Sequence, residues 1–551
     1  MADHPAVVVR GGADSAKHHA SGAKRLFEER PDFVMPDGWT HRTFTEMEAL
    51  SNRYANALTE VGITRGTRTL LMVRPGFDFV AVVFALFKMG AVPVMIDPGM
   101  GMGRLLGCIR DVRAGALVGI PAAQALRRVR PGAFASIEHA VTVGGQWGWG
   151  APKLATIAKS ASLQFDTIEP ASHESAAVLF TSGSTGPAKG VVYEHATFNA
   201  QIHAIASCYD IQPGEIDLPT FPLFALFSLA MGMTAIIPDM DPSHPANADP
   251  ARIIQTIRDF GVTSTFGSPA LWRRVAQYGD KHNAKLPTLK RILIAGAPVP
   301  PGTLESLRRM LPDGADVHTP YGATESLPVS SISGGEVLES CAQRTRTGGG
   351  TCVGKPAPGI DLRIIRVTDA PIPDWSDVAL VADGEIGEIV VAGDVVTREY
   401  FGLPEATTLA KIIEGERVWH RMGDVGYRDE TGRVWFCGRK AHRVITREGT
   451  LYSVPCEAVF NEHSDVLRCA LVGVGPVGAK TPVIVIEPEA GRFPSRGKKP
   501  AFVSELMEIA RNHAHTRSIG RVLFHRALPV DVRHNAKINR EALAQWARSR
   551  V

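Results

Sequence analysis

The sequence predicts an α/β protein: a large N-terminal domain of layered sheets and helices with a β-rich subdomain, followed by a small α+β domain. Three observations predict this class. Short apolar runs alternate with helix-like segments over most of the chain, which is typical of layered, largely parallel sheets. Near residue 380 the sequence becomes glycine-punctuated and rich in β-branched residues, which indicates β-structure. From about Arg439 onward the pattern is that of a compact α+β unit.

The apolar runs account for the expected strands of the large domain. Each run is short, rich in aliphatic or β-branched residues and bounded by turn residues. Two of the intervening stretches, 44–62 and 250–261, carry apolar residues at helical spacing. The expected strands are 68–73, 91–97, 115–120, 176–182, 234–239, 262–266 and 291–296.

One uncharged segment requires a choice between a membrane span and a buried element. Residues 221–238 (FPLFALFSLAMGMTAIIP) are barely long enough to cross a bilayer, contain Pro222 and Gly232, and have no basic flank after them. We therefore predict a buried helix followed by a strand. The polar, glycine-rich segment 333–352 predicts a mobile surface loop.

The composition argues against several classes of protein. The chain has 60 basic and 56 acidic residues, and this near balance does not favour nucleic-acid binding. Its 7 cysteines are scattered without a CxxC pair, which argues against a disulfide framework and a zinc site and suits reduced thiols in the cytoplasm. The N-terminus lacks the continuous apolar region of a secretory signal.

The strongest local signal is TSGSTGPAKG, residues 181–190, directly after the apolar run AAVLF. The amides and hydroxyls of such a loop can surround phosphate oxygens, and Lys189 adds a positive charge. The loop is not a Walker A motif, because Pro187 and Ala188 separate the second glycine from the lysine and Gly190 follows it. An ordinary Gly/Ser turn is the alternative.

This loop closely resembles the signature of the adenylate-forming (ANL) superfamily of acyl-CoA synthetases, peptide-synthetase adenylation domains and beetle luciferases. The resemblance extends from about residue 40 to the C-terminus. It implies the fold described above, activation of a carboxylic acid by ATP and Mg²⁺, and two domains: 1–438 for nucleotide and acyl substrate, and 439–551 as a mobile lid with a catalytic lysine. The implied ATP contacts of the loop are Thr181, Ser182, Gly183, Ser184, Thr185, Gly186 and Lys189, of which Thr185 is also expected to be catalytic.

Two further motifs match the superfamily in order. YGATE is similar to its YGxTE motif, which implies that the ring of Tyr321 stacks on adenine and that Glu325 ligates Mg²⁺. A flat aromatic ring suits a purine face, and a hard carboxylate suits a magnesium ion that bridges phosphates. AGAP, residues 295–298, resembles the end of the adenine-pocket strand. The resemblance thus adds Gly296, Ala297, Pro298, Gly322, Ala323 and Thr324 to the nucleotide site.

Three motifs follow towards the C-terminus. WHRMGD resembles W-x-TGD with Met422 in place of threonine, which implies that Asp424 accepts hydrogen bonds from both ribose hydroxyls. GRK resembles the start of the hinge motif, so Arg439 is expected near ribose or phosphate. NAKINR resembles GKxxR, so Lys537 is expected to bridge the substrate carboxylate and the α-phosphate. Outside this series, a lysine there would be an ordinary exposed residue.

The sequence departs from the superfamily mainly where a thioester-forming step would be served. At the hinge, Ala441 replaces lysine, His442 replaces aspartate, and TRE at 446–448 stands in place of SGG. Ala225 stands where members often have a histidine or an aromatic residue near the pantetheine channel, and Ala536 replaces glycine in the last motif. Neutral drift is the alternative explanation.

Aromatic residues in the uncharged segment favour an apolar acyl pocket. The candidate substrate residues are Phe221, Phe224, Ala225 and Phe227. Plain core packing would need the same composition. An apolar, fatty-acid-like substrate is therefore an expectation that rests on position within the superfamily.

Several stretches resemble one branch of the superfamily, the β-lactone synthetases of bacterial long-chain olefin biosynthesis. They are PLFALFSLAMG, the polar segment after YGATE, DWSDVALVADGEIGEIVVAGDVVTREYF and GRKAHRVITREGTLYS. This branch implies a 2-alkyl-3-hydroxyalkanoic acid that is adenylated and then closes to a β-lactone, with neighbouring olefin-pathway enzymes as candidate partners. The alternatives are a long-chain fatty acyl-CoA synthetase and a catalytically silent nucleotide- or lipid-binding protein on the same fold.

Overall fold

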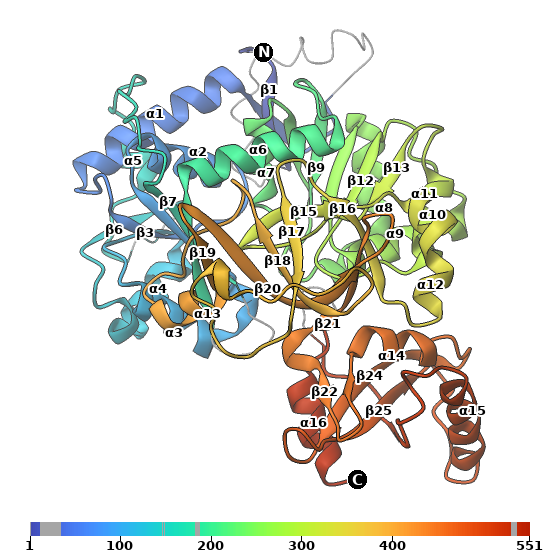
Figure 1. The fold of residues 1–551 in the computed structure, drawn as a ribbon. Helices are drawn as coiled ribbons and strands as arrows, with labels where there is room; N and C mark the ends of the chain where they lie inside the picture. Colours follow the sequence, from blue (N-terminus) through green and yellow to red (C-terminus); the bar gives the residue numbers. More distant parts are fainter. Residues whose placement is uncertain (1, 11–34, 146, 148, 182–187, 531–536) are drawn as a thin grey trace.

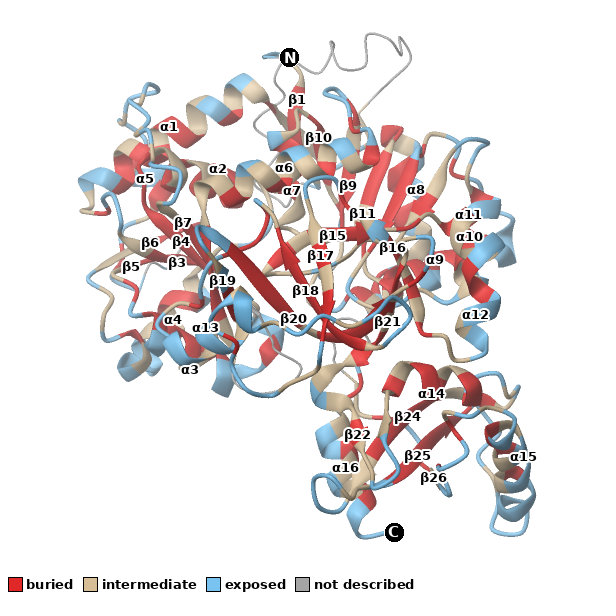
Figure 2. Cartoon of the chain, in the orientation of Figure 1, coloured by how far each residue is buried: buried red, intermediate tan, exposed pale blue. Residues whose placement is uncertain are grey.

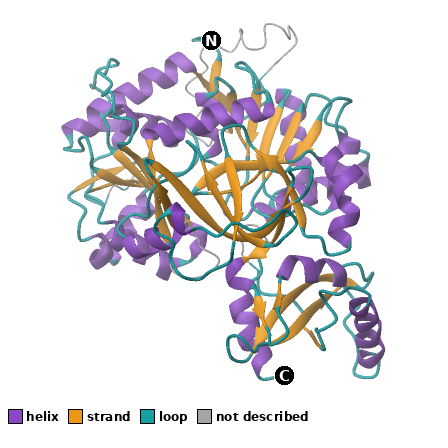
Figure 3. Ribbon diagram, in the orientation of Figure 1, coloured by secondary structure: helices purple, strands orange, loops and turns teal. Residues whose placement is uncertain are grey.

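The computed structural model describes residues 2–10, 35–145, 147, 149–181, 188–530 and 537–551. Three large sheets form the main body of the molecule, and a smaller C-terminal unit lies below that body in the view of Figure 1. Figure 3 shows helices around the sides of the main body and strands facing the viewer at its centre. The layered α/β class predicted from the sequence is confirmed.

The first sheet has six strands in the order β6-β5-β3-β4-β7-β8. Most of its residues are buried because helices cover parallel strands on both faces. The last pair, β7 and β8, is antiparallel and places Thr181 opposite Lys189. The strands are β3 (Arg68–Met72), β4 (Val92–Ile96), β5 (Ala116–Gly119), β6 (His139–Thr142), β7 (Ser175–Thr181) and β8 (Lys189–Glu194). The helices in this part of the chain are α1 (Phe44–Glu60), α2 (Phe77–Lys88), α3 (Met102–Val112), α4 (Pro121–Val129) and α5 (Leu154–Ile157).

The second sheet has seven strands in the order β13-β12-β11-β9-β10-β1-β2. It includes β1, an N-terminal strand that the sequence did not predict and that lies between β10, to which it is parallel, and the antiparallel edge strand β2. The strands are β1 (Pro5–Arg10), β2 (Trp39–Thr43), β9 (Ile216–Pro219), β10 (Thr234–Ile237), β11 (Ser264–Gly267), β12 (Arg291–Ile294) and β13 (Asp316–His318). The helices in this part are α6 (His195–Tyr209), α7 (Phe224–Ala230), α8 (Pro250–Phe260), α9 (Pro269–His282) and α10 (Pro301–Met310).

The third sheet has eight strands and contains the predicted β-rich subdomain. Neighbouring strands in it run antiparallel, and β19 pairs with β20 at the side of the main strand order. The strands are β14 (Tyr321–Ala323), β15 (Ser326–Ser331), β16 (Thr351–Pro356), β17 (Asp361–Ile365), β18 (Gly387–Ala392), β19 (Lys411–Glu414), β20 (Arg417–Arg428) and β21 (Val434–Arg439). Helix α13 (Pro404–Ala410) precedes β19.

The C-terminal unit has its own buried side chains, which Figure 2 shows as red strands and helix faces. A three-stranded sheet, β24-β25-β26, separates two apolar clusters. A division of the chain at residues 438 and 439 stays a prediction. The elements are β22 (Val444–Ile445), β23 (Thr450–Leu451), α14 (Ser453–Phe460), β24 (Val466–Val474), β25 (Thr481–Pro488), α15 (Lys499–Arg511), β26 (Arg521–Phe524) and α16 (Arg540–Arg548).

The structure tests the predictions made for two segments, 221–238 and 333–352. Residues 221–238 form helix α7 and strand β10, as predicted, and no helix in the described part of the chain is long and apolar enough to cross a membrane. The prediction of a loop over 333–352 is wrong, because three short helices occupy 334–346. Ser333 caps them by accepting a hydrogen bond from the amide of Glu336, and Cys341 is fully buried. These helices are α11 (Gly334–Glu336), the π-helical turn η5 (Val337–Cys341) and α12 (Ala342–Arg346).

Candidate active site

A cavity of about 2330 Å³ is lined by residues of all three large sheets and of the C-terminal unit. Ligands of open α/β sheets bind beyond the carboxyl ends of strands, and the segments that follow β9 and β12 line this cavity. The structure therefore brings together predicted residues that are up to 348 positions apart, from Lys189 to Lys537. The predicted residues in its wall are Lys189, Phe221, Phe224, Phe227, Gly296, Ala297, Pro298, Tyr321, Gly322, Ala323, Thr324, Glu325, Asp424, Arg439 and Lys537.

Most of the phosphate loop lies outside the described residues. These are Ser182, Gly183, Ser184, Thr185 and Gly186. Their contacts with ATP stay predictions. Of the flanking residues, Thr181 ends β7 and Lys189 begins β8. The ammonium of Lys189 lies 4.7 Å from the centre of the Tyr400 ring, a cation–π contact that holds the lysine at the cavity wall.

Asp424 is a buried carboxylate with one satisfied and one unsatisfied oxygen. The hydroxyl of Tyr321 donates a 2.7 Å hydrogen bond to Oδ2. Nη1 of Arg439 lies 3.1 Å from Oδ1 as an ion pair and also donates to the carbonyl oxygen of Met422. In the described part of the chain, no aligned donor reaches Oδ1. Buried polar atoms are rarely left in this state, so Oδ1 suits a ligand hydroxyl such as that of a ribose.

Burial and neighbouring charges act in opposite directions on this group. Burial raises the pKa of Asp424 overall, although Arg439, Tyr321 and Lys537 each lower it. The carboxylate in turn raises the pKa of Arg439, whose guanidinium stays charged. Burial and the adjacent carboxylate raise the pKa of the Tyr321 hydroxyl, which therefore remains a hydrogen-bond donor.

Glu325 is positioned by a segment that is distant in sequence and lies between β18 and α13. The hydroxyl of Tyr400 donates a 2.7 Å hydrogen bond to Oε1, and the amide of Thr397 donates a 2.9 Å bond to the carbonyl oxygen of Glu325. Behind this contact, the buried ammonium of Lys411 donates to the carbonyl oxygen of Thr397. Burial lowers the pKa of Lys411 to about 7, while the charge of Glu325 acts against that shift.

The possible metal ligands of the cavity suit a Mg²⁺ ion that is bound mainly through a nucleotide. They suit a metal ion enclosed by protein side chains less well. Among the described residues, no three His, Cys, Asp or Glu side chains are grouped closely enough to hold an ion. Magnesium that bridges phosphates needs only one or two protein carboxylates, and Glu325 is a carboxylate in the cavity wall.

The backbone of YGATE is shaped by close contacts. A Cβ atom at Gly322 would lie 2.8 Å from the carbonyl oxygen of Ser326, so glycine is required for this approach. The carbonyl oxygen of Thr324 accepts a 2.6 Å hydrogen bond from the hydroxyl of Tyr193. These contacts hold the segment between Tyr321 and Glu325 against the cavity.

The predicted acyl pocket is aromatic, with one correction. Phe224 stacks on Phe266 with ring centroids 3.6 Å apart, and Phe221 and Phe227 tilt against Phe224 at 5.9 and 5.8 Å. Ala225 does not line the cavity and is fully buried in the apolar core instead. The prediction that Ala225 belongs to the pocket is wrong, because each helical residue is turned about 100° from the one before it.

The C-terminal unit contributes Lys537 to the cavity wall. Its charge reaches the nucleotide site, since it lowers the pKa of Asp424. Arg540 anchors the following helix through two 2.7 Å hydrogen bonds to the carboxylate of Glu457. His442 also lines the cavity, and burial, assisted by nearby Arg540 and Arg439, lowers its pKa to about 3. Ala536 lies outside the described residues.

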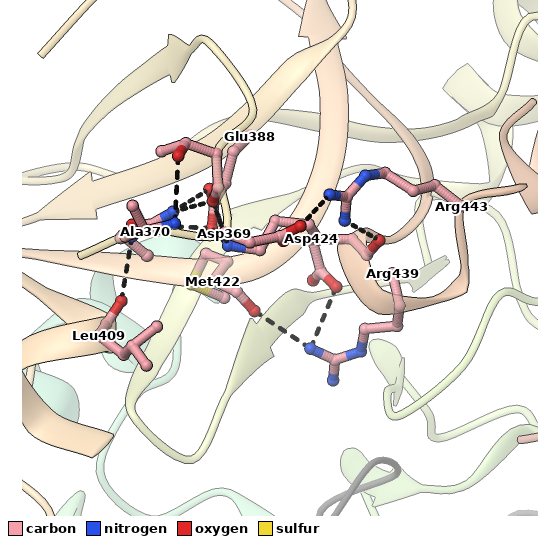
Figure 4. Close-up of polar contacts among 11 residues, drawn as sticks. Asp369, Ala370, Glu388, Leu409, Met422, Asp424, Arg439 and Arg443 are labelled. Carbon is pink, nitrogen blue, oxygen red and sulfur yellow. Dashed lines mark hydrogen bonds and ion pairs between the residues drawn. The ribbon is translucent and has the colours of Figure 1, made fainter. Parts of the chain in front are cut away.

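The linker after β21 is tied to the third sheet by contacts that the sequence did not reveal. Figure 4 shows them together with the Asp424–Arg439 pair. Nζ of Lys440 lies 2.9 Å from the fully buried carboxylate of Glu388, which also pairs with Arg421 at 2.7 Å. Arg443 pairs with Asp369 at 2.5 Å. The linker is thus joined to the N-terminal part of the chain in the same arrangement in which Lys537 lines the cavity.

Tyr193, Tyr400, Lys411 and Glu388 are site residues that sequence reasoning missed. Tyr193 lies in β8, Glu388 in β18 and Lys411 in β19, while Tyr400 lies between β18 and α13. Glu388 and Tyr400 fall within the stretch 374–401, whose resemblance to the olefin branch assigns no role to single residues. A buried lysine in β19 is the signal that could have drawn attention, since lysine is almost never fully buried without a partner.

Comparison with known proteins gives a consistent result. The AMP-binding enzyme family matches residues 23–401. An olefin β-lactone synthetase of Xanthomonas campestris pv. campestris is 46% identical over 549 residues, covering 96% of this chain and 97% of the relative. One of Stenotrophomonas maltophilia is 48% identical over 514 residues, covering 92% and 91%. The amide bond synthetase McbA of Marinactinospora thermotolerans shares the fold, with a TM-score of 0.74, 23% identity and coverage of 92% and 95%.

Proposed function

The chain belongs to the AMP-binding enzyme family, and we propose that it is an ATP-dependent ligase that converts a 2-alkyl-3-hydroxyalkanoic acid into a β-lactone. The acid is first activated as its acyl-adenylate, with release of diphosphate. Its own 3-hydroxyl then displaces AMP. The observation that carries the proposal is the meeting of Tyr321, Glu325, Asp424 and Lys537 in one cavity, in a chain 46% and 48% identical to two olefin β-lactone synthetases.

Each of these residues has a role in adenylation that follows from its chemistry. Tyr321 offers a flat ring to adenine, and the unsatisfied Oδ1 of Asp424 accepts a ribose hydroxyl. The substrate carboxylate attacks the α-phosphorus as diphosphate leaves. Two anions approach each other in this step, and the cation of Lys537 stabilises the charge that builds between them.

We assign magnesium to Glu325, which Tyr400 holds by a 2.7 Å hydrogen bond. When bound, Mg²⁺ neutralises phosphate charge and orients the leaving diphosphate. The phosphate loop, including Thr185, and Lys189 are assigned to the phosphates on the strength of the motif. The same motif argument assigns Gly296, Ala297 and Pro298 to the adenine pocket.

The ion pairs of the linker favour lactone formation over thioester formation. Thioester formation needs room for a second substrate at the carbonyl, whereas a 3-hydroxyl is already tethered to it. Tethering gives effective molarities of about 10⁵–10⁸ M in well-oriented cases, which helps to offset the strain of a four-membered ring. The ion pairs of Lys440 and Arg443 with the third sheet support a mechanism that keeps one orientation of the C-terminal unit.

Further assignments accompany this proposal. We divide the chain into an N-terminal nucleotide and acyl-substrate domain, 1–438, and a C-terminal lid, 439–551, with Lys537 on the lid. The seven free cysteines support a reducing compartment, and we place the enzyme in the cytoplasm. As partners we propose the neighbouring enzymes of olefin synthesis, because two relatives are named olefin β-lactone synthetases and their substrates and products would be shared with such enzymes.

Product analysis with and without CoA tests the proposal. With ATP, Mg²⁺ and a 2-alkyl-3-hydroxy acid, we expect AMP, diphosphate and a product that lacks both a free carboxylate and a free hydroxyl. An acid without the 3-hydroxyl should stop at the adenylate or hydrolyse slowly. Turnover that depends on CoA and yields a thioester would identify an acyl-CoA synthetase instead. Absence of ATP–diphosphate exchange with any lipid acid would identify a silent binding protein.

A further inference from the structure

The wall of the cavity contains two apolar regions that belong to different parts of the fold. One is built on the second sheet with helices α6 and α7, and the other on the first sheet with helices α3 and α4. In Figure 1 these helix pairs lie apart, α3 and α4 at the lower left and α6 and α7 at the upper centre. Their side chains also belong to separate hydrophobic clusters. The cavity therefore has two apolar walls rather than one.

The first region, which we call the closed arm, has a buried lining. Its members are Ile205, Tyr209, Met231, Met233, Phe266 and Leu293. Met233 is 1% exposed and Leu293 is 7% exposed. Phe227, one of the predicted pocket residues, packs against the same cluster. None of its members is exposed, so we infer that this arm ends inside the protein and limits the length of a bound chain.

The second region, which we call the open arm, reaches the surface. Its members are Leu70, Met72, Ile96, Leu105, Leu126 and Phe180. The same lining continues to Met102 and Val129, which are 55% and 71% exposed. Because these two side chains continue the apolar lining of the cavity to the surface, we infer that an apolar ligand can pass there. A chain in this arm can extend into solvent or against another surface.

Strand β8 and helix α6 join the two arms at the candidate active site. Phe180 of the open arm lies opposite Gly190, one position from Lys189. At the other end of β8, the ring of Tyr193 lies 4.6 Å from that of Phe198, which lies 6.0 Å from Phe227 beside the closed arm. Lys189 and Tyr193 both line the cavity between the arms. The part of the cavity that Lys189 and Tyr193 line thus borders both apolar arms.

We propose that the two arms hold the two alkyl chains of one substrate molecule, one chain in each arm. The inference rests on the proposed function, because a 2-alkyl-3-hydroxy acid carries one chain on C2 and one on C3, both next to the carboxylate. A fatty acid with a single chain needs only one arm. The cavity must also hold ATP, but sites for ordinary small ligands measure about 300–1,000 Å³, and this one, at about 2330 Å³, leaves room for two chains beside the nucleotide. The closed arm selects the length of one chain, and the open arm tolerates variation in the other.

Chain-length series of the substrate test the proposal in the full-length enzyme. One series varies the C2 chain at a fixed C3 chain, and the other does the reverse, with diphosphate release as the readout. We expect one series to show a length beyond which kcat/KM falls about tenfold or more, since single methylenes change discrimination about 10–200-fold in apolar pockets. The other series should show no such limit. Equal limits in both series, or none in either, would overturn the proposal.

Substitutions in each arm supply the second measurement. Ala125→Trp and Leu126→Trp place bulk in the open arm, where both residues line the cavity from α4. Each should lower, about tenfold or more, the ratio of kcat/KM for a two-chain acid to that for an acid with one chain cut to methyl. Met231→Trp should reduce the maximum chain length that the closed arm accepts. Arg128→Trp, on the same helix but outside the cavity, is the matched control and should leave the ratio unchanged.

The outcomes separate this inference from the proposed function. An unchanged ratio in both open-arm variants refutes the second chain site even if the wild type makes lactone. Failure of the wild type to make lactone refutes the proposed function. In that case, diphosphate release from the same acids would still test whether the two arms bind two alkyl chains. Turnover of the one-chain acid shows that each variant is folded.

Discussion

The hydroxyl of Tyr400 donates a 2.7 Å hydrogen bond to Oε1 of Glu325, across 75 residues of sequence. Burial, together with the carboxylate, raises the pKa of this tyrosine, so its hydroxyl stays protonated and remains a donor. The same ring receives the ammonium of Lys189 at 4.7 Å. Tyr400 therefore links the carboxylate assigned to magnesium with the lysine assigned to the phosphates.

Removal of the Tyr400 hydroxyl should weaken the use of magnesium. Tyr400→Phe should raise the Mg²⁺ concentration for half-maximal diphosphate release about 10–100-fold, the usual cost of losing a partner that orients a metal ligand. Glu325→Gln should have the larger effect, because it removes the charge itself. Tyr427→Phe is the matched control, since its hydroxyl bonds the carbonyl oxygen of Gly349 outside the cavity. Wild-type magnesium dependence in Tyr400→Phe would refute this role.

Asp424→Asn should weaken ATP binding through the ribose. A hydrogen bond to a charged group contributes about 1.5–3 kcal/mol, so the KM for ATP should rise about 10–150-fold. Because burial raises the pKa of Asp424, its carboxylate is protonated at a higher pH than an ordinary aspartate. ATP affinity of the wild type should therefore fall as the pH falls towards that pKa, and the variant should lack this decline. Equal pH profiles for the two proteins would contradict the assignment.

Lys537→Ala should slow adenylation about 10²–10³-fold, the cost of removing a preorganised donor from a transition state. Folding should change little, because this side chain is exposed. Diphosphate release in a single turnover is the measurement. Lys498→Ala, an exposed lysine of the same unit that does not line the cavity, is the control. Near-normal release by a folded Lys537→Ala protein would remove this lysine from the mechanism.

His442 should make the protein less stable in acid. Its pKa is about 3 in the folded protein and 6.5 for an ordinary histidine. Between these values the unfolded chain binds a proton that the folded chain does not, so the free energy of unfolding falls as the pH falls below about 6.5. Relative to wild type, His442→Gln should gain up to about 2 kcal/mol between pH 7.5 and pH 5. Urea unfolding at pH 7.5 and pH 5 measures this difference. Equal losses of unfolding free energy in the two proteins would show that His442 is not the cause.

The ion pair of Lys440 with Glu388 should hold the linker in place. Lys440→Met keeps most of the apolar stem but removes the charge, while Glu388 keeps its contact with Arg421. Hydrogen exchange in residues 440–443 should become faster, and adenylation should slow because Lys537 is held less firmly. Lys355→Met, an exposed lysine on β16, controls for loss of a charge. Unchanged exchange in the linker would show that this contact does not restrain it.

Several features of the protein could be predicted because their signals are local. The alternation of apolar runs and amphipathic stretches defines the sheets and helices, and 221–238 forms its helix and strand as expected. Tyr321, Glu325, Asp424 and Lys537 were found through short motifs in a fixed order, and they line one cavity. Motifs of this kind keep their spacing because neighbouring backbone atoms must hold one ligand. Their individual roles stay predictions.

Other features depend on how distant segments pack. Ala225 turns into the core although its neighbour Phe224 lines the cavity, and the polar segment near Cys341 is helical and packs that cysteine into the interior. No spacing in the sequence relates Tyr400 to Glu325 or Lys440 to Glu388.

The sequence by itself determined the fold class, the family and the candidate site residues, since these depend on local periodicity and on motifs. The tertiary structure alone decided how those residues are positioned and that the cavity has two apolar arms. Such relationships arise when separate sheets pack against one another, and the free energy of that packing depends on side chains far apart in the chain.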